Sequence, residues 1–335
     1  FAFIAMTCLF FFWGFITVLN DILIPFLKES FDLNYTQALL VQFCFFGAYF
    51  IVSPFAGRLI DKVGFQTGIV IGLLTTALGC ILFYPSADLH IYGLFLFAFF
   101  VLASGITILQ VAANPYVAAL GPDKTAASRL NLAQAANSLG TTVGPFVGTM
   151  LILGVVAADA SAVQMPYLMI AAILVAAALL FRNIRLPKLA HLETNAYVAN
   201  DSVWHHRSRV LGALAISMYV GGEVSIVSCL VYYFAESSIA GMEIAEAGEM
   251  VGYYWGAAMI GRLVGAFLMN YIASTKYLAV NAVIAIVMII VSMNTSGSVA
   301  MWSILAVGFF NSIMFPTIFT LAVKGLGSMT SKGSG

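Results

Sequence analysis

Residues 57–64 read Gly57-Arg58-Leu59-Ile60-Asp61-Lys62-Val63-Gly64 and separate two long apolar runs, at about 36–56 and 67–85. Each run has the length of a helix that crosses the roughly 30 Å hydrocarbon core of a bilayer. The glycines allow a tight turn, and Asp61 is placed to accept from a neighbouring helix end. The sequence therefore predicts two membrane helices joined by a charged turn, with Gly57, Asp61, Lys62 and Gly64 as a conformational latch.

Apolar runs of this length continue along the whole chain. Its 335 residues are 62% hydrophobic and 8% charged, whereas about a quarter of the residues in a soluble domain are charged. Only helices and closed barrels satisfy their backbone groups in lipid, and the short alternating segments of a barrel are absent here. We therefore expect an all-α membrane protein with ten spans, at about 1–27, 36–56, 67–85, 91–120, 130–155, 166–182, 209–235, 250–272, 277–293 and 298–323.

The basic residues are consistent with this arrangement of spans. If the N-terminus is cytoplasmic, Lys28 is the only one of the 14 Lys and Arg that lies on the outer side. A wrong number of spans would scramble this alternation. The positive-inside rule thus predicts a multi-pass protein of the cytoplasmic (inner) membrane, whose N-terminus and long central connection are cytoplasmic.

Three features recur at a spacing of roughly 200 residues, as in carriers built from repeats. Gly57-Arg58-Leu59 returns as Gly261-Arg262-Leu263, Pro115 returns as Pro316, and Asp21 is matched by Glu223. We expect two pseudo-symmetric six-helix halves, 1–182 and 209–335, joined by a cytoplasmic segment at 183–208. The second half would then hold four of its six helices, so the last two are predicted to be absent from this chain.

Asp21 and Glu223 are lone acids within apolar spans. An ionised carboxylate there costs about 2.5–3.5 kcal/mol on insertion scales, so it should face a cavity or a partner. Burial also disfavours the charged form, which suits a group that gains and loses a proton. Both are candidate cation-coupling residues; for Glu223, pairing with a tyrosine hydroxyl is the alternative.

Side-chain amides concentrate in the fourth and fifth spans. Amides both donate and accept hydrogen bonds, as sugar hydroxyls do, and Gln110 and Asn114 share one helical face. Amides in membrane helices also tie helices together. The clustering favours a sugar site, and the candidate substrate-binding residues are Asn137, Gln134, Gln110, Asn114, Asn20 and Gln42.

Catalytic and metal-binding patterns are absent from the sequence. None of the four histidines lies within a predicted span, and there is no HExxH, GxSxG or P-loop pattern. The four cysteines lie in apolar runs without metal-ligand spacing. We expect no enzyme, no metal site, no cofactor and no nucleic-acid partner. A channel or a non-transporting sugar sensor remains the alternative from another class.

Several stretches resemble the fucose–galactose–glucose:proton symporter family of the major facilitator superfamily. The turn at 57–64 resembles the superfamily's G-x-L-x-D-[RK]-x-G signature. The stretches closest to the symporter family are Leu19-Asn20-Asp21-Ile22-Leu23-Ile24-Pro25, Ala112-Ala113-Asn114-Pro115-Tyr116, Arg129-Leu130-Asn131-Leu132-Ala133-Gln134 with Asn137-Ser138, and Phe315-Pro316-Thr317-Ile318-Phe319. The resemblance implies a major facilitator fold, a role for Asp21 in sugar and proton handling, and a sugar-site asparagine at Asn137.

Two positions depart from the fucose branch of that family. Gln110 stands where that branch has an acid, and Glu223 stands where it has a glutamine, a pattern that resembles the glucose/galactose branch. We therefore expect symport of a hexose such as glucose or galactose by a carrier that functions as a monomer. The expected coupling ion is a proton, with sodium as the alternative.

One further pattern favours a different transporter. Gly140-x3-Gly144-Pro145-x2-Gly148 in the fifth span resembles the pattern of drug:proton antiporters in the same superfamily. The same glycines would also serve close helix packing in a symporter. A proton-coupled exporter of drugs or other small molecules is therefore the second hypothesis.

Overall fold

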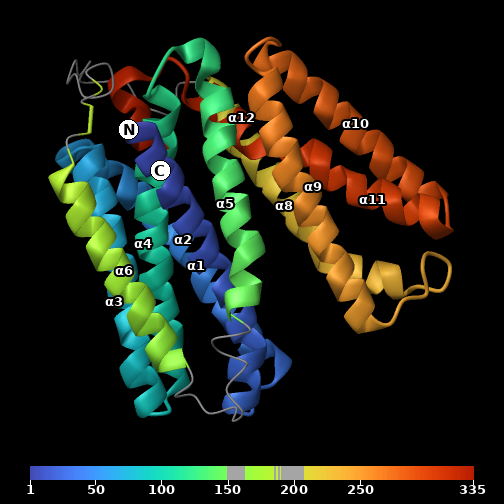
Figure 1. Ribbon diagram of the computed structural model, residues 1–335, viewed down its shortest axis with the longest axis horizontal. Coiled ribbons are helices and arrows are strands. Elements are labelled where there is room, and N and C mark those ends of the chain that lie inside the picture. Colours follow the sequence, from blue (N-terminus) through green and yellow to red (C-terminus); the bar gives the residue numbers. More distant parts are fainter. Residues whose placement is uncertain (149–162, 185, 188, 190–206) are drawn as a thin grey trace.

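The computed structural model describes the chain apart from residues 149–162, 185, 188 and 190–206, and apart from the side chains of residues 20–26, 29, 35, 38, 145, 146, 148, 209, 244, 245 and 328. The described part is a bundle of helices (Figure 1). The first half contains α1 (Ala2–Ser30), α2 (Tyr35–Val63), α3 (Phe65–Asp88), α4 (Tyr92–Ala119), α5 (Ala126–Gly148) and α6 (Gln164–Asn183). The second contains α8 (Arg207–Ala235), α9 (Ile244–Leu268), α10 (Ser274–Asn294), α11 (Gly297–Asn311), α12 (Met314–Val323) and α13 (Thr330–Ser334).

The predicted multi-pass membrane fold is confirmed. Eight segments of the described chain are long and apolar enough to cross a bilayer. Successive long helices run in opposite directions, so that α1 begins at the same end of the bundle where α4 ends and α5 begins (Figure 1). We term this end the N-side. The predicted connection at 183–208 lies mostly outside the described residues.

The eighth predicted span, 250–272, is displaced. The corresponding helix α9 runs from Ile244 to Leu268. Glu246 and Glu249, which precede the predicted span, therefore lie in the first two turns of α9. Acidic side chains are favourable there because they face the positive end of the helix dipole.

The tenth predicted span, 298–323, is not one continuous helix. It divides into α11 and α12 around Ser312 and Ile313. Pro316 has no N–H group to donate to the carbonyl of Ser312 four residues earlier. That carbonyl instead accepts a hydrogen bond of 3.2 Å from Nε of Arg262 on α9. The break follows from the proline, and the freed carbonyl becomes a tertiary contact.

The two halves meet along α5, which stands between them (Figure 1). The larger apolar cluster lies mainly in the first half but includes Phe319, Val323 and Leu326 of the second, and a smaller cluster lies within the second half alone. A third, small cluster joins the halves and contains Ala127 of α5, Met269 at the end of α9 and Ile313 at the α11–α12 break. Helix α5 thus packs on α1 within its own half and on α9 and α12 across the interface.

Candidate functional site

Four polar residues form a stripe along α5: Ser128, Asn131, Gln134 and Ser138. Their spacing of three or four residues places them on one helical face. Ser128 Oγ donates to the Ala266 carbonyl of α9 at 2.5 Å. Because this bond and those described next reach the second half, the stripe is the polar seam of the interface.

Asn131 makes the deepest contact of this seam. Its Nδ2 donates to Thr317 Oγ1 of α12 at 3.2 Å and to its own helix at the Ala127 carbonyl at 2.8 Å. Both Asn131 and Thr317 are fully buried. Asn131 therefore acts as a tie between helices of the two halves.

Arg262 enters the same seam from α9. Besides its bond to Ser312, its Nη1 donates to Ser138 Oγ and, at 3.4 Å, to the Gln134 carbonyl on α5. In the sequence, Arg262 stands out only as part of the repeated Gly-Arg-Leu and as a basic residue expected on the inner side. Its position six residues before the end of an apolar helix was a signal that could have marked it, because cations within membrane spans are costly and usually functional.

Glu223 lies on α8 and has a partner. The hydroxyl of Tyr219, one turn earlier, donates to Glu223 Oε1 at 2.6 Å. The pairing with a tyrosine hydroxyl is therefore present, and the coupling role of Glu223 stays a prediction. Glu223 and Arg262 do not form an ion pair within 4.0 Å in the described part of the chain.

Tyr254 and Asn311 complete the polar group of the second half. Asn311 Nδ2 donates to the Tyr254 hydroxyl at 2.5 Å, and Tyr254 is fully buried. The sequence offers Asn311 as one more amide and Tyr254 as an aromatic face for a sugar ring, but neither is among the candidate substrate-binding residues. Tyr254 thus belongs to the buried core of the second half, whereas Tyr219, Glu223 and Arg262 are half-buried.

Three of the predicted sugar-binding amides lie together in the first half. Gln134 Nε2 of α5 donates to Asn114 Oδ1 of α4 at 3.5 Å, and both are buried. Gln110 is one turn before Asn114 on α4, and its buried Oε1 has no hydrogen-bond partner in the described part of the chain. A buried acceptor without a donor costs free energy, so this atom is a natural point for a ligand hydroxyl.

Asn137 points from α5 toward α1. Its Nδ2 donates to the Phe10 carbonyl at 3.1 Å, and a Cβ at Gly14 would collide with the Asn137 backbone carbonyl. One turn on, a Cβ at Gly140 would collide with the Phe11 carbonyl. The glycines of the antiporter-like pattern therefore serve the close approach of α5 to α1.

The remaining predicted substrate and coupling residues are less defined. Asn20 and Asp21 belong to α1, but their side chains lie outside the described residues. Gln42 is half-buried on α2. The roles assigned to these three residues stay predictions.

The predicted latch lies at the N-side end of α2. Asp61 Oδ2 pairs with Lys332 Nζ at 3.2 Å, and Asp61 Oδ1 accepts from Ser331 at 3.2 Å. A Cβ at Gly57 would approach the Ser331 carbonyl to 2.8 Å. Gly64 joins α2 to α3 with φ +81°, whereas Lys62 is exposed. The latch sequence thus contacts α13 of the second half.

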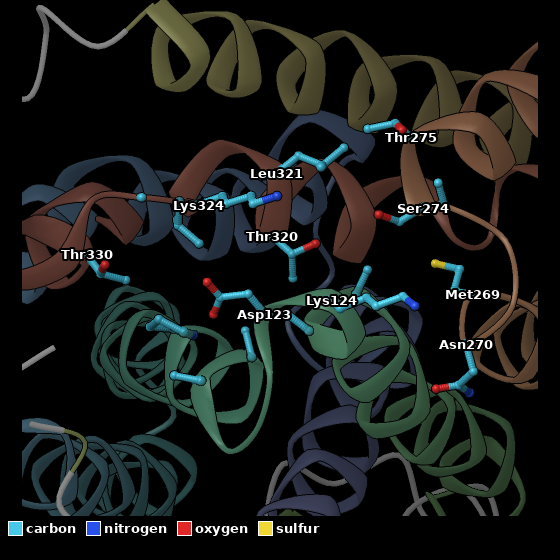
Figure 2. A pocket seen from close by; sticks show the side chains of 18 of the residues that line it. Asp123, Lys124, Met269, Asn270, Ser274, Thr275, Thr320, Leu321, Lys324 and Thr330 are labelled. Atoms are coloured by element: carbon cyan, nitrogen blue, oxygen red, sulfur yellow. The ribbon is translucent and has the colours of Figure 1, made fainter. Parts of the chain in front are cut away.

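A cavity of about 660 Å³ lies on the N-side between the halves. Figure 2 shows Asp123 and Lys124 on the first-half side, facing Thr320 and Lys324 of the second. Met269 lines this cavity and also contacts Asn131 and Thr317. The cavity therefore ends at the polar seam, which separates it from the middle of the bundle.

A family model of the Major Facilitator Superfamily matches residues 2–335. The chain belongs to the Major Facilitator Superfamily. It is 53% identical over its full length to a glucose/galactose transporter of Brucella abortus, and it spans 83% of that protein. It is 35% identical to the L-fucose-proton symporter of Escherichia coli over 98% of this chain and 81% of the symporter.

A crystal structure of the Major Facilitator transporter FucP in the outward conformation matches the fold. The TM-score is 0.91 at 34% identity, over 99% of this chain and 86% of that one. The predicted family and the predicted Major Facilitator fold of two helical halves are confirmed. This member of the Major Facilitator Superfamily is a membrane transporter and not an enzyme.

Proposed function

We propose that this chain carries a hexose such as glucose or galactose across the membrane together with a proton. The observation that carries the proposal is the 53% identity, over the whole chain, with a glucose/galactose transporter. The name of the L-fucose-proton symporter, at 35% identity, supports proton coupling. Sodium is kept as an outcome of the test below.

The sugar site that we propose lies beside α4 and α5. Gln110 of α4 offers a buried amide oxygen without a hydrogen-bond partner in the described structure. Asn114, one turn later on α4, is hydrogen-bonded to Gln134 of α5. Amides can donate to and accept from the same hydroxyl group. Asn137, Asn20 and Gln42 would complete the site from α5, α1 and α2.

The coupling scheme uses the two acids. Asp21 of the first half and Glu223 of the second would face one central cavity. Neutralisation of an acid by a proton would precede sugar binding, and the loaded carrier would then switch sides. An uncompensated charge would penalise the occluded state, which is how binding of one substrate comes to depend on the other.

The described contacts support a carrier closed on its N-side. The seam of α5 and the contacts of Asp61 both lie there, and the matching FucP structure is an outward conformation. We assign the N-side to the cytoplasm of an inner-membrane protein. The carrier would act as a monomer whose halves, 1–182 and 209–335, rock about the central site.

The test is uptake by the carrier in proteoliposomes. An imposed proton gradient should drive accumulation of labelled glucose or galactose above its external concentration, and a sodium gradient alone should not. Asp21→Asn should abolish accumulation while leaving the protein folded. Asp88→Asn, at the exposed end of α3, is the matched control. Normal accumulation by Asp21→Asn refutes its coupling role, and accumulation driven by sodium alone refutes the choice of ion.

A drug exporter is the competing transporter. The glycine pattern that favoured an exporter is weaker evidence now, because Gly140 and Gly144 each face α1 at distances that leave no room for a Cβ. Close helix packing therefore accounts for these two glycines. Expulsion of a dye from the same liposomes, without accumulation of sugar, would favour the exporter. Downhill movement only, or binding without movement, would favour a channel or a sensor.

A further inference from the structure

Asn311 is buried with one end of its amide unsatisfied. Its Nδ2 donates to the Tyr254 hydroxyl of α9 at 2.5 Å, and its Oδ1 has no hydrogen-bond partner among the described residues. Asn311 is 4% exposed and Tyr254 is fully buried. Close packing holds the two together, since a Cβ at Gly308, one turn before Asn311, would come within 2.5 Å of the Tyr254 carbonyl oxygen. A buried acceptor without a donor costs free energy, and a ligand that supplies the donor would remove this cost.

The pair of Asn311 and Tyr254 offers both kinds of hydrogen-bonding group. The Tyr254 hydroxyl accepts from Asn311, and its own O–H finds no acceptor in the described part of the chain. Turning the amide over would exchange its nitrogen and oxygen, but one donor and one acceptor would still be left. A sugar hydroxyl donates one hydrogen bond and accepts others, so it matches this pair.

Gln110 holds the equivalent position in the first half. Three buried amide oxygens lack a partner in the part of the chain that the structure describes, those of Gln110, Asn131 and Asn311. Asn131 belongs to the seam, whereas Gln110 and Asn311 each lie five residues before a proline of the repeat, Pro115 and Pro316. Halves related by an axis along the membrane normal place equivalent residues at the same depth. Gln110 and Asn311 are therefore matched amides of the two halves.

The hydrogen bonds next to these amides repeat as well. Each proline leaves the carbonyl four residues earlier without a helical donor, and these carbonyls belong to Val111 and Ser312, the residues directly after the two amides. Ser334 Oγ donates to the Val111 carbonyl at 3.0 Å, and Arg262 Nε donates to the Ser312 carbonyl at 3.2 Å. In both halves the amide thus lies where the helical hydrogen bonds are interrupted and a carbonyl is bonded to another helix.

Asn311 lies at the depth expected of a central site. It is the last residue of α11, near the middle of the apolar segment Gly297–Val323. Proline-interrupted helices at corresponding positions of two halves mark the substrate site of many carriers. Every residue of the sugar site proposed above comes from the first half, although a carrier whose halves move around its substrate needs contacts from both.

We propose that Asn311 and the Tyr254 hydroxyl bind one hydroxyl group of the sugar from the second half, opposite Gln110. The sugar hydroxyl donates to Asn311 Oδ1 and accepts from the Tyr254 O–H. Because Asn311 ends α11, its side chain can turn toward the sugar while α12 stays in place. The inference rests on the proposed transport of a hexose, and it adds the wall of the site that the second half supplies.

The experiment measures which sugar hydroxyl Asn311 binds. Purified carrier in lipid nanodiscs would bind labelled glucose, in competition with unlabelled glucose and with analogues that each lack one hydroxyl group. Asn311→Leu keeps the approximate size of the side chain and removes its polar atoms. It should weaken glucose binding about three- to tenfold, the usual contribution of a hydrogen bond. The analogue without the hydroxyl that Asn311 binds should have equal affinity for the wild type and the variant.

Two further variants test the assignment. Tyr254→Phe removes only the hydroxyl, so it should weaken glucose binding about threefold and leave the binding of the same analogue unchanged. Asn281→Leu is the matched control. Asn281 is also a buried asparagine of the second half, but its Nδ2 donates to the Tyr277 carbonyl of its own helix at 2.8 Å. This variant should bind glucose and every analogue as the wild type does.

The pattern over the analogues decides between sugar binding and a mere tie of α11 to α9. A tie alone predicts the same loss for glucose and all analogues, and that result would overturn the inference, as would unchanged glucose affinity in Asn311→Leu. If Asn311→Leu does not fold, the same comparison in Tyr254→Phe decides. A wild type that binds neither glucose nor galactose refutes the proposed substrate and the inference together, whereas wild-type binding with a uniform loss in the variants overturns the inference alone.

Discussion

The amide of Asn131 on α5 and the hydroxyl of Thr317 on α12 are joined at 3.2 Å across the two halves, and both residues are fully buried. The bond lies beside Met269, which lines the N-side cavity. It is therefore part of the layer that keeps the cavity apart from the middle of the bundle. A carrier that opens on the N-side must break it.

Asn131→Ala should consequently favour the open N-side. Hydrogen bonds between membrane helices contribute about 0.6 kcal/mol on average and at most about 1.7 kcal/mol. The ratio of closed to open carrier should therefore fall about threefold, and by no more than about eighteenfold. Accessibility of a cysteine at Asn270 to a membrane-impermeant reagent would measure this. Thr317→Val should have a similar effect, and the double variant should be no more open than either single one. Additive effects of the two substitutions would argue against the shared bond.

Gly140→Ala should destabilise the carrier by about 1–3 kcal/mol, because overpacking forces α5 away from α1. The new Cβ would collide with the Phe11 carbonyl and lie 2.8 Å from the Phe15 amide nitrogen. Thermal unfolding in detergent would show a lower midpoint. Gly47→Ala is the matched control, since a Cβ there meets nothing within 4 Å. Equal midpoints for the two variants would disprove the packing role of Gly140.

Asp61→Asn should loosen the latch without unfolding the protein. The Asp61 and Lys332 side chains are 19% and 27% exposed, so solvent screens their pair, and its loss should cost about 0–1 kcal/mol. The measurable effect is faster downhill entry of sugar, because the N-side opens more readily. Lys62→Ala changes an exposed neighbour and should leave the rate as it is. A rate unchanged in Asp61→Asn as well would remove the latch from the transport cycle.

Gln110→Glu combined with Glu223→Gln should move the carrier toward the behaviour of the fucose branch that it resembles. The pair returns the acid to α4 and removes it from α8, so the group that takes up the proton changes halves. Competition between labelled galactose and unlabelled L-fucose, measured over a range of pH, would detect the change. Sugar preference and pH response identical to those of the wild type would count against this exchange of acids.

The fold was predictable to a large extent, because crossing a bilayer is a local requirement. Segment length, apolar composition and the alternation of basic residues depend on neighbouring residues alone. Most predicted spans therefore coincide with a single helix, although the tenth is divided into α11 and α12 and the fifth runs past Gly148 into residues outside the described part of the chain. The break at Ser312 was marked in the sequence by Pro316, but its hydrogen bond with Arg262 was not.

The site was predictable only as a set of residue types. Lone acids and clustered amides can be recognised in an apolar sequence, because placing such side chains in lipid costs free energy and they are rarely found there without a function. Which groups they bond depends on helices brought together from far apart in the chain. Asn137 thus turned out to bond α1, Asn131 the second half, and Glu223 a tyrosine one turn away. The membrane character and the candidate polar residues follow from local chemistry. The hydrogen bonds of Arg262 to α5 were settled by tertiary packing, since hydrogen bonds form only between groups that the fold places in contact.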